Sequence, residues 1–278
     1  MKKEEFRAES NIDLIKEVQK KLPFLSNYQI DKILKNKDIK VNNRRVKDNQ
    51  TLTKGDYVEV YYDIEEKPWF DEIYQDENVL VVNKKGGIEV ISETDRDLLS
   101  ILRSQYGDVR AVHRIDRNTE GLVIFAKNDM AEKEILRAFK DKTVTKKYLL
   151  ECNGKVDVSK IKPRLFLKKL SNVSKVIISE VKTSGYEEIK TNLRFVSYNG
   201  KTTLLEAELL TGKTHQIRAH ISYYGHSIVG DGKYGIGDKK MHLTSYFLKF
   251  HLKENNPLAY LNNLHFEIMP SWLKMSKN

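Results

Sequence analysis

Residues 113–127 read HRIDRNTEGLVIFAK, a polar loop that runs directly into an apolar segment. The apolar half, 121–126, is typical of a buried strand. A polar loop at the end of such a rigid element is exposed and free for binding or chemistry. Within the loop, Asp116 lies between Arg114 and Arg117 and should stay ionised beside two cations. Taken alone, such a group is more often a structural ion pair than a catalytic one.

Residues 211–220 read TGKTHQIRAH, a glycine-containing turn that leads into a predicted helix. We expect Thr214 to be the residue that caps this helix at its N-terminus. A zinc site is a poor fit, because His215 and His220 are five residues apart instead of the four of a helical metal pair, and no HExxH motif occurs. The local interpretation is a capped helix with a basic face.

The elements around these two stretches favour the α+β class. Strands outnumber helices and do not alternate regularly with them, which argues against a doubly wound parallel sheet. No GxGxxG or GxxxxGK[ST] motif occurs, so dinucleotide-binding and P-loop domains are not indicated. Further strands are expected at 79–82, 148–150, 193–196 and 203–210, and a helix at 131–139 with Ile135, Leu136 and Phe139 facing inward.

Residues 10–62 have the pattern of a small unit of their own. An apolar stripe predicts a helix that begins near Ser10 and breaks at Pro23, and Ser26 has the position of a second N-cap. A hairpin at 39–46 and an alternating strand at 57–62 follow. The segment 65–68 resembles a linker, so we expect one domain at 1–64 and a second at 65–278.

This small unit carries an uneven charge. Seven basic residues and one acid lie between Lys32 and Lys47. A solvated surface is the usual explanation of such a run, but here it covers a helix and a hairpin turn, where donors can meet phosphate oxygens. The residues expected to form an RNA-binding surface are Lys32, Lys35, Lys40, Asn42, Arg44 and Arg45.

The composition agrees with a polyanionic partner. The chain has 278 residues, 40% of them hydrophobic and 32% charged, and a net charge of +10. That balance is typical of a globular protein, and the basic excess favours nucleic acid without requiring it. The single cysteine, Cys152, excludes a disulfide framework and a cysteine-rich zinc site. No signal-like or membrane-spanning apolar run occurs, so we expect a cytoplasmic location and no membrane partner.

The two stretches together are far more specific than either alone. Residues 113–127 resemble the signature motif of the bacterial ribosomal large-subunit (Rlu A-type) pseudouridine synthases, and 212–220 resemble the second motif of that family. Residues 82–84, 147–148 and 230–235 resemble its other motifs in the same order. Residues 10–62 resemble the S-four-type RNA-binding module, which is common in this family. The resemblance implies a small RNA-binding module followed by a mixed, largely antiparallel-sheet catalytic domain.

The resemblance also implies a reaction. Pseudouridine formation detaches uracil from ribose through nitrogen and rejoins it through carbon, so no cofactor or metal is required. The family's catalytic aspartate corresponds to Asp116, which would act as nucleophile or stabilise positive charge at the ribose. The family tyrosine corresponds to Tyr148, which would shuttle a proton and stack on the base. Arg218 corresponds to the basic residue that pairs with the aspartate.

The remaining implied roles concern the substrate. Ile217 would pack on the uracil, and Arg114 would hold the place or the phosphate of a flipped nucleotide. His113, Thr119, His215 and Gln216 are expected on the substrate side as well. The target would be a specific uridine in structured RNA, with ribosomal RNA as the first expectation and tRNA as the second, acted on by a monomer.

Three positions depart from the usual family pattern. Lys85 stands where proline is common, Glu120 where serine is common, and Lys213 where arginine is common. None of them is a position to which a catalytic role is assigned. We expect Glu120 to add negative charge near the site and to change substrate preference.

Two alternatives remain open at the level of the sequence. The chain could be a non-catalytic RNA-binding or ribosome-assembly factor, although Asp116, Tyr148 and Arg218 argue against this. It could also be an RNA N-glycosidase that uses the same carboxylate and releases free uracil. Uridine methylation is disfavoured, because no motif for a nucleophilic cysteine surrounds Cys152.

Overall fold

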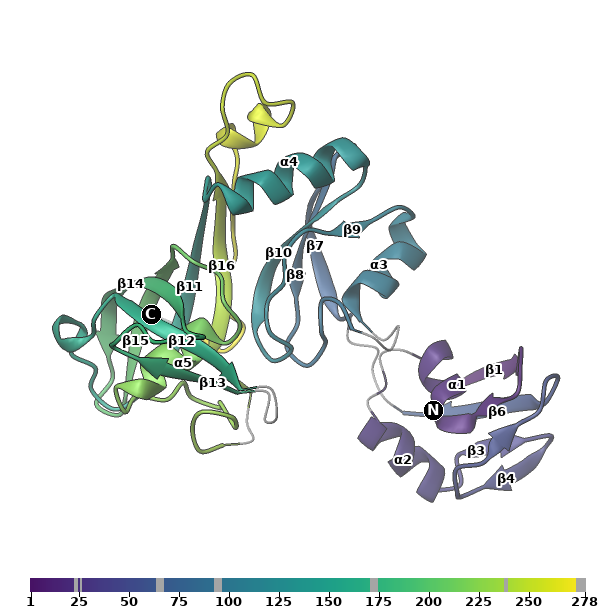
Figure 1. Ribbon diagram of the computed structural model, residues 1–278. Coiled ribbons are helices and arrows are strands. Elements are labelled where there is room, and N and C mark those ends of the chain that lie inside the picture. Colours follow the sequence, from purple (N-terminus) through teal and green to yellow (C-terminus); the bar gives the residue numbers. More distant parts are fainter. Residues whose placement is uncertain are drawn as a thin grey trace, which may run out of the picture. The chain divides into compact units, whose positions relative to one another are not determined.

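A computed structural model of the chain describes residues 1–22, 25, 27–63, 68–92, 97–170, 175–237 and 240–273. The chain forms two compact units, Met1–Trp69 and Phe70–Asn278, each of which is described here by itself (Figure 1). The expected boundary at 64–65, most of the expected linker at 65–68, the helix breaker Pro23 and the N-cap Ser26 lie outside the described residues.

The first unit is an antiparallel sheet in the order β1-β6-β3-β4, with two helices and a short strand pair, β2-β5. Buried side chains from both helices and from the sheet form one core. The elements are β1 (Lys2–Arg7), β2 (Ile12–Asp13), α1 (Leu14–Lys21), α2 (Asn27–Lys35), β3 (Ile39–Val41), β4 (Arg44–Val46), β5 (Thr51–Leu52) and β6 (Tyr57–Tyr62).

The N-terminal edge of this unit differs from the prediction. Strand β1 was not predicted, because its sequence, KKEEFR, is charged and lacks an apolar alternation. It forms nevertheless, since backbone pairing with β6 does not depend on apolar side chains and its surface is largely open to solvent. Helix α1 begins at Leu14 instead of near Ser10, because the side chain of Asp13 accepts a hydrogen bond from the backbone N of Lys16 at 3.1 Å.

The second unit is built on one large mixed sheet, which confirms the α+β class. In the described part of the chain its order is β13-β12-β14-β15-β11-β16-β10-β8-β7, with β17 beside β16 and β9 beside β10. The elements are β7 (Phe70–Gln75), β8 (Val79–Lys84), α3 (Leu98–Tyr106), β9 (Arg110–Ala111), β10 (Glu120–Ala126), α4 (Asp129–Lys140), β11 (Val144–Asn153), η1 (Val158–Lys160), β12 (Arg164–Leu170), β13 (Lys175–Ser179), β14 (Glu187–Tyr198), β15 (Thr202–Leu209), α5 (Gln216–Tyr223), β16 (Leu243–Phe250), η2 (Ala259–Asn263) and β17 (His265–Glu267).

Two apolar clusters hold the helices to this sheet. Helix α4 packs on β8, β10 and β16, whereas α5 packs on β11 and β15. In α4, Ile135 is fully buried, but Leu136 is 46% exposed. The expectation that Leu136 faces inward is therefore wrong, because consecutive helical residues point about 100° apart and Ile135 already occupies the buried face.

The parallel pair β10–β16 lies inside the sheet, between β11 and β8, and depends on one glycine. Gly121 is paired with Ser245 and has a φ of +125°. A Cβ atom at Gly121 would lie 2.3 Å from the backbone O of Ser245, which is shorter than any real contact of this kind. Only glycine fits here, and β10 places the polar loop 113–119 at its N-terminal end.

We predict that Gly121→Ala strongly destabilises the second unit. The matched control is Gly200→Ala, because Gly200 also has a positive φ, of +90°, but a Cβ there meets nothing within 4 Å. The control should lose only the backbone penalty of about 1–2 kcal/mol. Gly121→Ala should lose this and the cost of displacing Ser245, at least about 2 kcal/mol more. Equal unfolding free energies of the two variants in urea titrations would contradict this account.

Candidate active site

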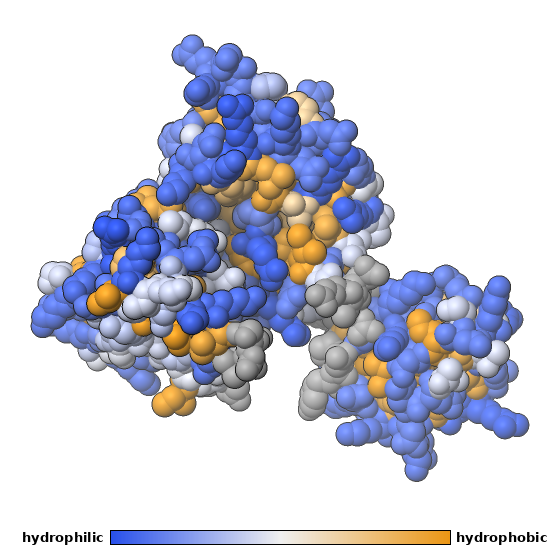
Figure 2. Space-filling model, in the orientation of Figure 1, coloured by the Kyte–Doolittle hydropathy of each residue, from blue (hydrophilic) through white to orange (hydrophobic). Residues whose placement is uncertain are grey.

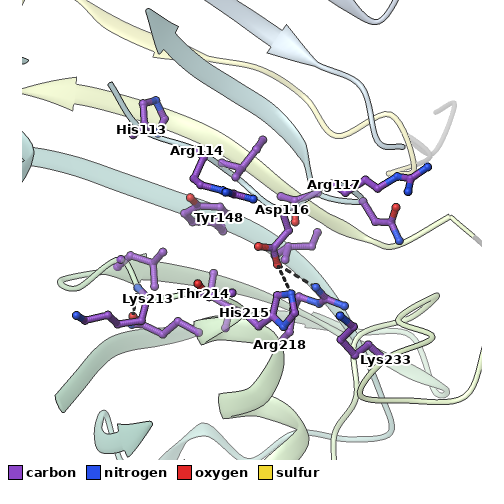
Figure 3. Close-up of a pocket in the computed structure, with 18 of the residues that line it drawn as sticks. His113, Arg114, Asp116, Arg117, Tyr148, Lys213, Thr214, His215, Arg218 and Lys233 are labelled. Carbon is purple, nitrogen blue, oxygen red and sulfur yellow. Dashed lines mark hydrogen bonds and ion pairs between the residues drawn. The ribbon is translucent and has the colours of Figure 1, made fainter. Parts of the chain in front are cut away.

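A cavity of about 930 Å³ lies in the second unit. Its walls come from the loop 113–119, from the start of β11, from residues 212–218 and from the loop at 232–233, which are far apart in the sequence (Figure 3). In Figure 2, this face of the second unit is hollowed, and hydrophilic residues surround apolar patches in the hollow. The two sequence stretches singled out above therefore line one cavity.

Asp116 and Arg218 meet across this cavity. Nη1 of Arg218, in the first turn of α5, donates to Oδ2 of Asp116 at 2.9 Å. The Arg218 side chain is only 7% exposed, whereas that of Asp116 is 22% exposed. The Asp116 carboxylate is therefore bound on its protein side by the buried guanidinium group of Arg218, and its other side stays accessible from the cavity. The charges next to Asp116 in the sequence do not do this, because Arg117 donates through Nε to the backbone O of Gly87.

A second carboxylate, which the sequence analysis did not single out, holds Arg218. Asp231 is buried, and its two oxygens accept from Nε and Nη2 of Arg218, both at 2.8 Å. Burial alone would raise the pKa of Asp231, but the hydrogen bonds and the charge of Arg218, together with the backbone N–H groups of Lys233 and Tyr234, outweigh it, and the net pKa is lowered. Burial alone would lower the pKa of Arg218, but Asp231 and Asp116 together raise it. The sequence signals were an acid between two glycines, at 230–232, and the resemblance of 230–235 to a family motif, which assigned no role to Asp231.

The loop that carries Asp116 is fixed by a buried lysine. Lys84, at the end of β8, is 0% exposed, and its Nζ donates to the backbone O of Lys85, Ile88 and Arg117 at 2.8–3.0 Å. Burial lowers the pKa of Lys84 to about 7, and the charge of Asp116 opposes this shift. Three carbonyl acceptors match the three N–H donors of an ammonium group. The loop backbone therefore has a definite position before any ligand binds.

Tyr148 and Ile217 form the apolar part of the cavity. Tyr148, on β11, is 8% exposed and Ile217, on α5, is 4% exposed, and both line the cavity. Burial raises the pKa of Tyr148 to about 12, so its phenol keeps its proton at neutral pH. The side chains that the resemblance assigns to the base thus lie beside the Asp116 carboxylate.

The start of α5 differs from the prediction. His215, not Thr214, is the N-cap residue, and it has a φ of +53° and no side-chain capping bond. Its Nδ1 is 2.9 Å from the hydroxyl of Tyr234, and its Nε2 is 3.9 Å from Oδ2 of Asp116. Burial lowers the pKa of His215 to about 4 although Asp116 opposes this, so the ring is neutral near pH 7. His215 is a neutral polar neighbour of the carboxylate.

The side chain of Gln216 holds the loop together. It accepts from the backbone N of Lys213 and from the Thr211 hydroxyl, and it donates to the backbone O of Lys190 and to the Thr191 hydroxyl. Its contacts are thus all within the protein, and it is 2% exposed. Gln216 lines the cavity, and its role toward the substrate stays a prediction beside this structural one.

The other predicted substrate residues also lie around the cavity. Arg114 is exposed and lines it. Thr119 is buried, and its backbone N donates to the backbone O of Asp116. Nε2 of His113 accepts from the backbone N of Ile124 at 3.0 Å, so this ring is bound to β10. Burial lowers the pKa of His113 to about 3, which keeps the ring neutral.

Glu120 does not line the cavity. Its carboxylate accepts from the Thr244 hydroxyl and the backbone N of Ser271, and it is paired with Nζ of Lys240 at 3.0 Å. The expectation that its charge acts at the site is therefore not supported. The Glu120 side chain, at a position where serine is common in the family, ties β10 and β16 to the segment that follows β17. The other two departures, Lys85 and Lys213, form ion pairs with Asp71 and Glu187.

In the first unit, only some of the side chains expected to bind RNA are without a partner among the described residues. Lys32, Lys35 and Arg44 are exposed and have no ion pair within the described residues. Lys40 instead contacts the Tyr61 ring and Glu59. The side chain of Asn42 is bound to Asp56 and Tyr57, and Arg45 donates to the backbone O of Lys37.

Two broader observations hold for the described residues. No group of three or more His, Cys, Asp or Glu side chains has the arrangement of a metal site. No helix is long and apolar enough to cross a bilayer.

Comparisons with known proteins agree on one family. The family model described as RNA pseudouridylate synthase matches residues 78–223. A protein of Mycoplasma capricolum named as an uncharacterized RNA pseudouridine synthase is 30% identical over 88% of this chain and 89% of its own length. Ribosomal large subunit pseudouridine synthase C of Buchnera aphidicola is 30% identical over 91% of this chain and 84% of its own length.

The fold comparison points the same way. The structure of human RNA pseudouridylate synthase domain containing 1 has a TM-score of 0.56 and 23% identity, over 77% of this chain and 94% of that one. Human RNA pseudouridylate synthase domain containing 4 has a TM-score of 0.51 and 19% identity, over 72% and 94%. At these identities the likeness concerns the fold.

We predict that Asp231→Asn destabilises the protein by about 3–5 kcal/mol near pH 7, because it removes the charge that balances a buried guanidinium. Since the folded-state pKa of Asp231 lies below its ordinary value of 3.8, its stabilisation is present above that pH and is lost as the pH falls through the lower, folded value. Urea unfolding of both proteins at several pH values is the measurement. The difference in unfolding free energy between the original protein and Asp231→Asn should shrink below about pH 4. A difference that does not depend on pH would contradict the assignment of Asp231 as the ionised partner of Arg218.

Proposed function

The chain belongs to the RNA pseudouridine synthase family, and on that premise we propose that it converts a specific uridine of structured RNA to pseudouridine with Asp116 as the catalytic carboxylate. The observation that carries this proposal is the accessible carboxylate of Asp116, which Arg218 holds at 2.9 Å in a cavity beside Tyr148 and Ile217. Of the two carboxylate oxygens of Asp116, only Oδ2 accepts a side-chain hydrogen bond from the described residues. Oδ1 is therefore left for the substrate.

The reaction uses these residues as follows. Asp116 attacks the anomeric carbon of the ribose, or stabilises positive charge there, as the bond to the uracil nitrogen breaks. The base turns, and a carbon of its ring joins the anomeric carbon while any bond between that anomeric carbon and Asp116 breaks and returns the carboxylate. The uracil ring carbon then loses its proton, and the uracil nitrogen gains one. Arg218 keeps its hydrogen bond to Oδ2 of Asp116 in place, because its other side remains paired with Asp231. Tyr148, protonated at neutral pH, stacks on the base and can hand over a proton.

The target nucleotide enters the cavity by flipping out of the RNA. Flipping costs a few kcal/mol and is least costly in loops and bulges, so structured RNA with an unpaired uridine is the expected substrate. Ribosomal RNA comes first, because a relative of similar length is named a ribosomal large subunit pseudouridine synthase. tRNA comes second. The exposed Arg114 at the cavity would hold the displaced nucleotide, and a cytoplasmic monomer suffices for this work.

We assign the first unit to RNA binding as an S-four-type module. Its helices and small sheet present Lys32, Lys35 and Arg44 to solvent, and these three have no carboxylate partner within the described residues. Free cations of this kind release counterions when they meet phosphates, which supplies affinity without sequence specificity.

We predict that Asp116→Asn abolishes conversion and leaves RNA affinity within a few-fold of the original. The amide has the shape of the carboxylate but neither its charge nor its nucleophilicity. Tritium release from RNA labelled at uridine carbon five, with large-subunit rRNA and bulk tRNA as substrates, measures turnover, and sequencing maps the modified uridine. Asp71→Asn, which removes a surface carboxylate paired with Lys85, is the control and should keep full activity.

Two outcomes would overturn the proposal. Appreciable turnover by purified Asp116→Asn would remove Asp116 from the chemistry. Free uracil, detected by chromatography of the original protein's reaction, would identify an N-glycosidase instead of an isomerase.

We predict that the triple change Lys32→Gln, Lys35→Gln and Arg44→Gln weakens RNA binding and flattens its salt dependence. Each lost phosphate contact should lower the slope of log affinity against log salt by about 0.7–0.9. The control is the double change Lys20→Gln and Lys21→Gln, since both lysines are already paired with Glu9. If both variants change the slope equally for each charge removed, RNA binding is not confined to the surface formed by α2 and the β3–β4 hairpin.

A further inference from the structure

A smaller hollow of about 360 Å³ adjoins the cavity of Asp116. It lies between the end of α4, the start of β11 and the segment after β15. Several side chains line both spaces, among them Phe139, Lys146 and Lys213. The two spaces therefore meet at these residues, and a chain that leaves the larger one can continue into the smaller one.

Lys146 stands at this junction with an unbalanced charge. Its Nζ lies 5.4 Å from the centroid of the Phe139 ring, and within the described residues no carboxylate lies within ion-pair distance of it. Burial lowers the pKa of Lys146, and no acid opposes the shift. The neighbouring Lys147, on the opposite face of β11, is paired with Glu206 at 3.6 Å. A half-buried cation without a counter-ion costs stability, and such groups gather at functional sites.

The wall behind Lys146 is fixed. The Phe139 ring packs against the His113 ring with centroids 4.7 Å apart, and His113 is bound through Nε2 to the backbone of β10. Neither ring can supply a negative charge to Lys146, because phenylalanine is uncharged and histidine is either neutral or cationic. Lys146 also precedes Tyr148 by two residues on β11, so both side chains face the same side of the strand. The ammonium group is thus held beside the tyrosine assigned to the base.

We propose that Lys146 binds a phosphodiester group next to the target uridine and so directs the RNA chain from the larger cavity into the smaller hollow. The inference rests on the proposed function and names the part of the substrate that this residue recognises. A phosphodiester carries one negative charge, which is what the unbalanced ammonium lacks, and its anionic oxygens accept strong, charge-assisted hydrogen bonds. Lys142 also lines the hollow and adds positive charge along the same path, whereas the Lys213 charge is balanced by Glu187 and the hollow also includes the acid Glu208.

The test couples one side chain to one phosphate. The probe is a short synthetic RNA that spans the uridine mapped in the conversion assay, made with a neutral methylphosphonate at the linkage on either side of that uridine. For the original protein, one of the two replacements should weaken binding about tenfold or more. For Lys146→Met, which keeps the apolar stem on Phe139, the same replacement should have little further effect. Lys146→Arg should restore most of the loss.

Lys147→Met is the matched control, because it removes one positive charge from the same strand but on the other face. It should show the full methylphosphonate effect. A purely structural role for Lys146 predicts a lower melting temperature for Lys146→Met, whereas removal of an unbalanced cation should leave it unchanged or raise it. The inference is overturned if Lys146→Met keeps the full effect at both linkages, or if Lys147→Met loses it.

The two proposals can fail separately in these measurements. Conversion of the mapped uridine by the original protein reports on the proposed function and on Asp116. The coupling between residue 146 and the linkage is a ratio of binding constants, so it reports on Lys146 regardless of the rate of conversion.

Discussion

The guanidinium group of Arg218 is the point on which the site depends. It is buried between two carboxylates, with two hydrogen bonds to Asp231 and one to Asp116. Asp116 lies 102 residues before it and Asp231 lies 13 residues after it, so this one side chain joins three segments of the chain. Burying an ion is costly unless its donors are used, and the planar fork of arginine suits the bidentate half of this arrangement. Asp231 neutralises the cation, which leaves the more exposed Asp116 free to react.

The opposite wall of the cavity is equally well fixed, by different means. One hydrogen bond from Lys84, to the backbone O of Arg117, ties the loop that carries Asp116 to the segment 85–88, where Lys85 and Ile88 accept the other two. The glycine at 121 lets β10 pair closely with β16. A charge that stabilises a developing charge is most effective when it does not have to move during the reaction. The buried lysine and the buried arginine together give Asp116 a definite position before RNA binds. The Asp116 carboxylate is therefore oriented during folding and does not have to be reorganised during the reaction.

Several charges have different partners from those that their sequence neighbours suggest. Arg117 adjoins Asp116 in the chain but binds the backbone of Gly87. Glu120 follows Asp116 by four residues, at the start of β10, yet its carboxylate contacts Ser271 and Lys240. Gln216 belongs to a motif that lines the cavity, but its side chain holds the turn. Adjacent residues on a strand or a tight loop point in different directions, so adjacency along the chain says little about contact across a site.

Elements whose signal is local could be predicted from the amino-acid sequence. Apolar runs indicated the strands around 79–82 and 121–126, the balance of strands and helices indicated the α+β class, and two motifs indicated the family. These features depend on periodicity and on short-range backbone preferences, which a few adjacent residues encode. Strand β1 was missed because its stability comes from pairing with β6, more than fifty residues away, and its own side chains carry no apolar pattern. The roles of Asp231, Lys84 and Lys146 were decided only by the tertiary structure, because burial and the presence or absence of a counter-charge are properties of segments that meet in space.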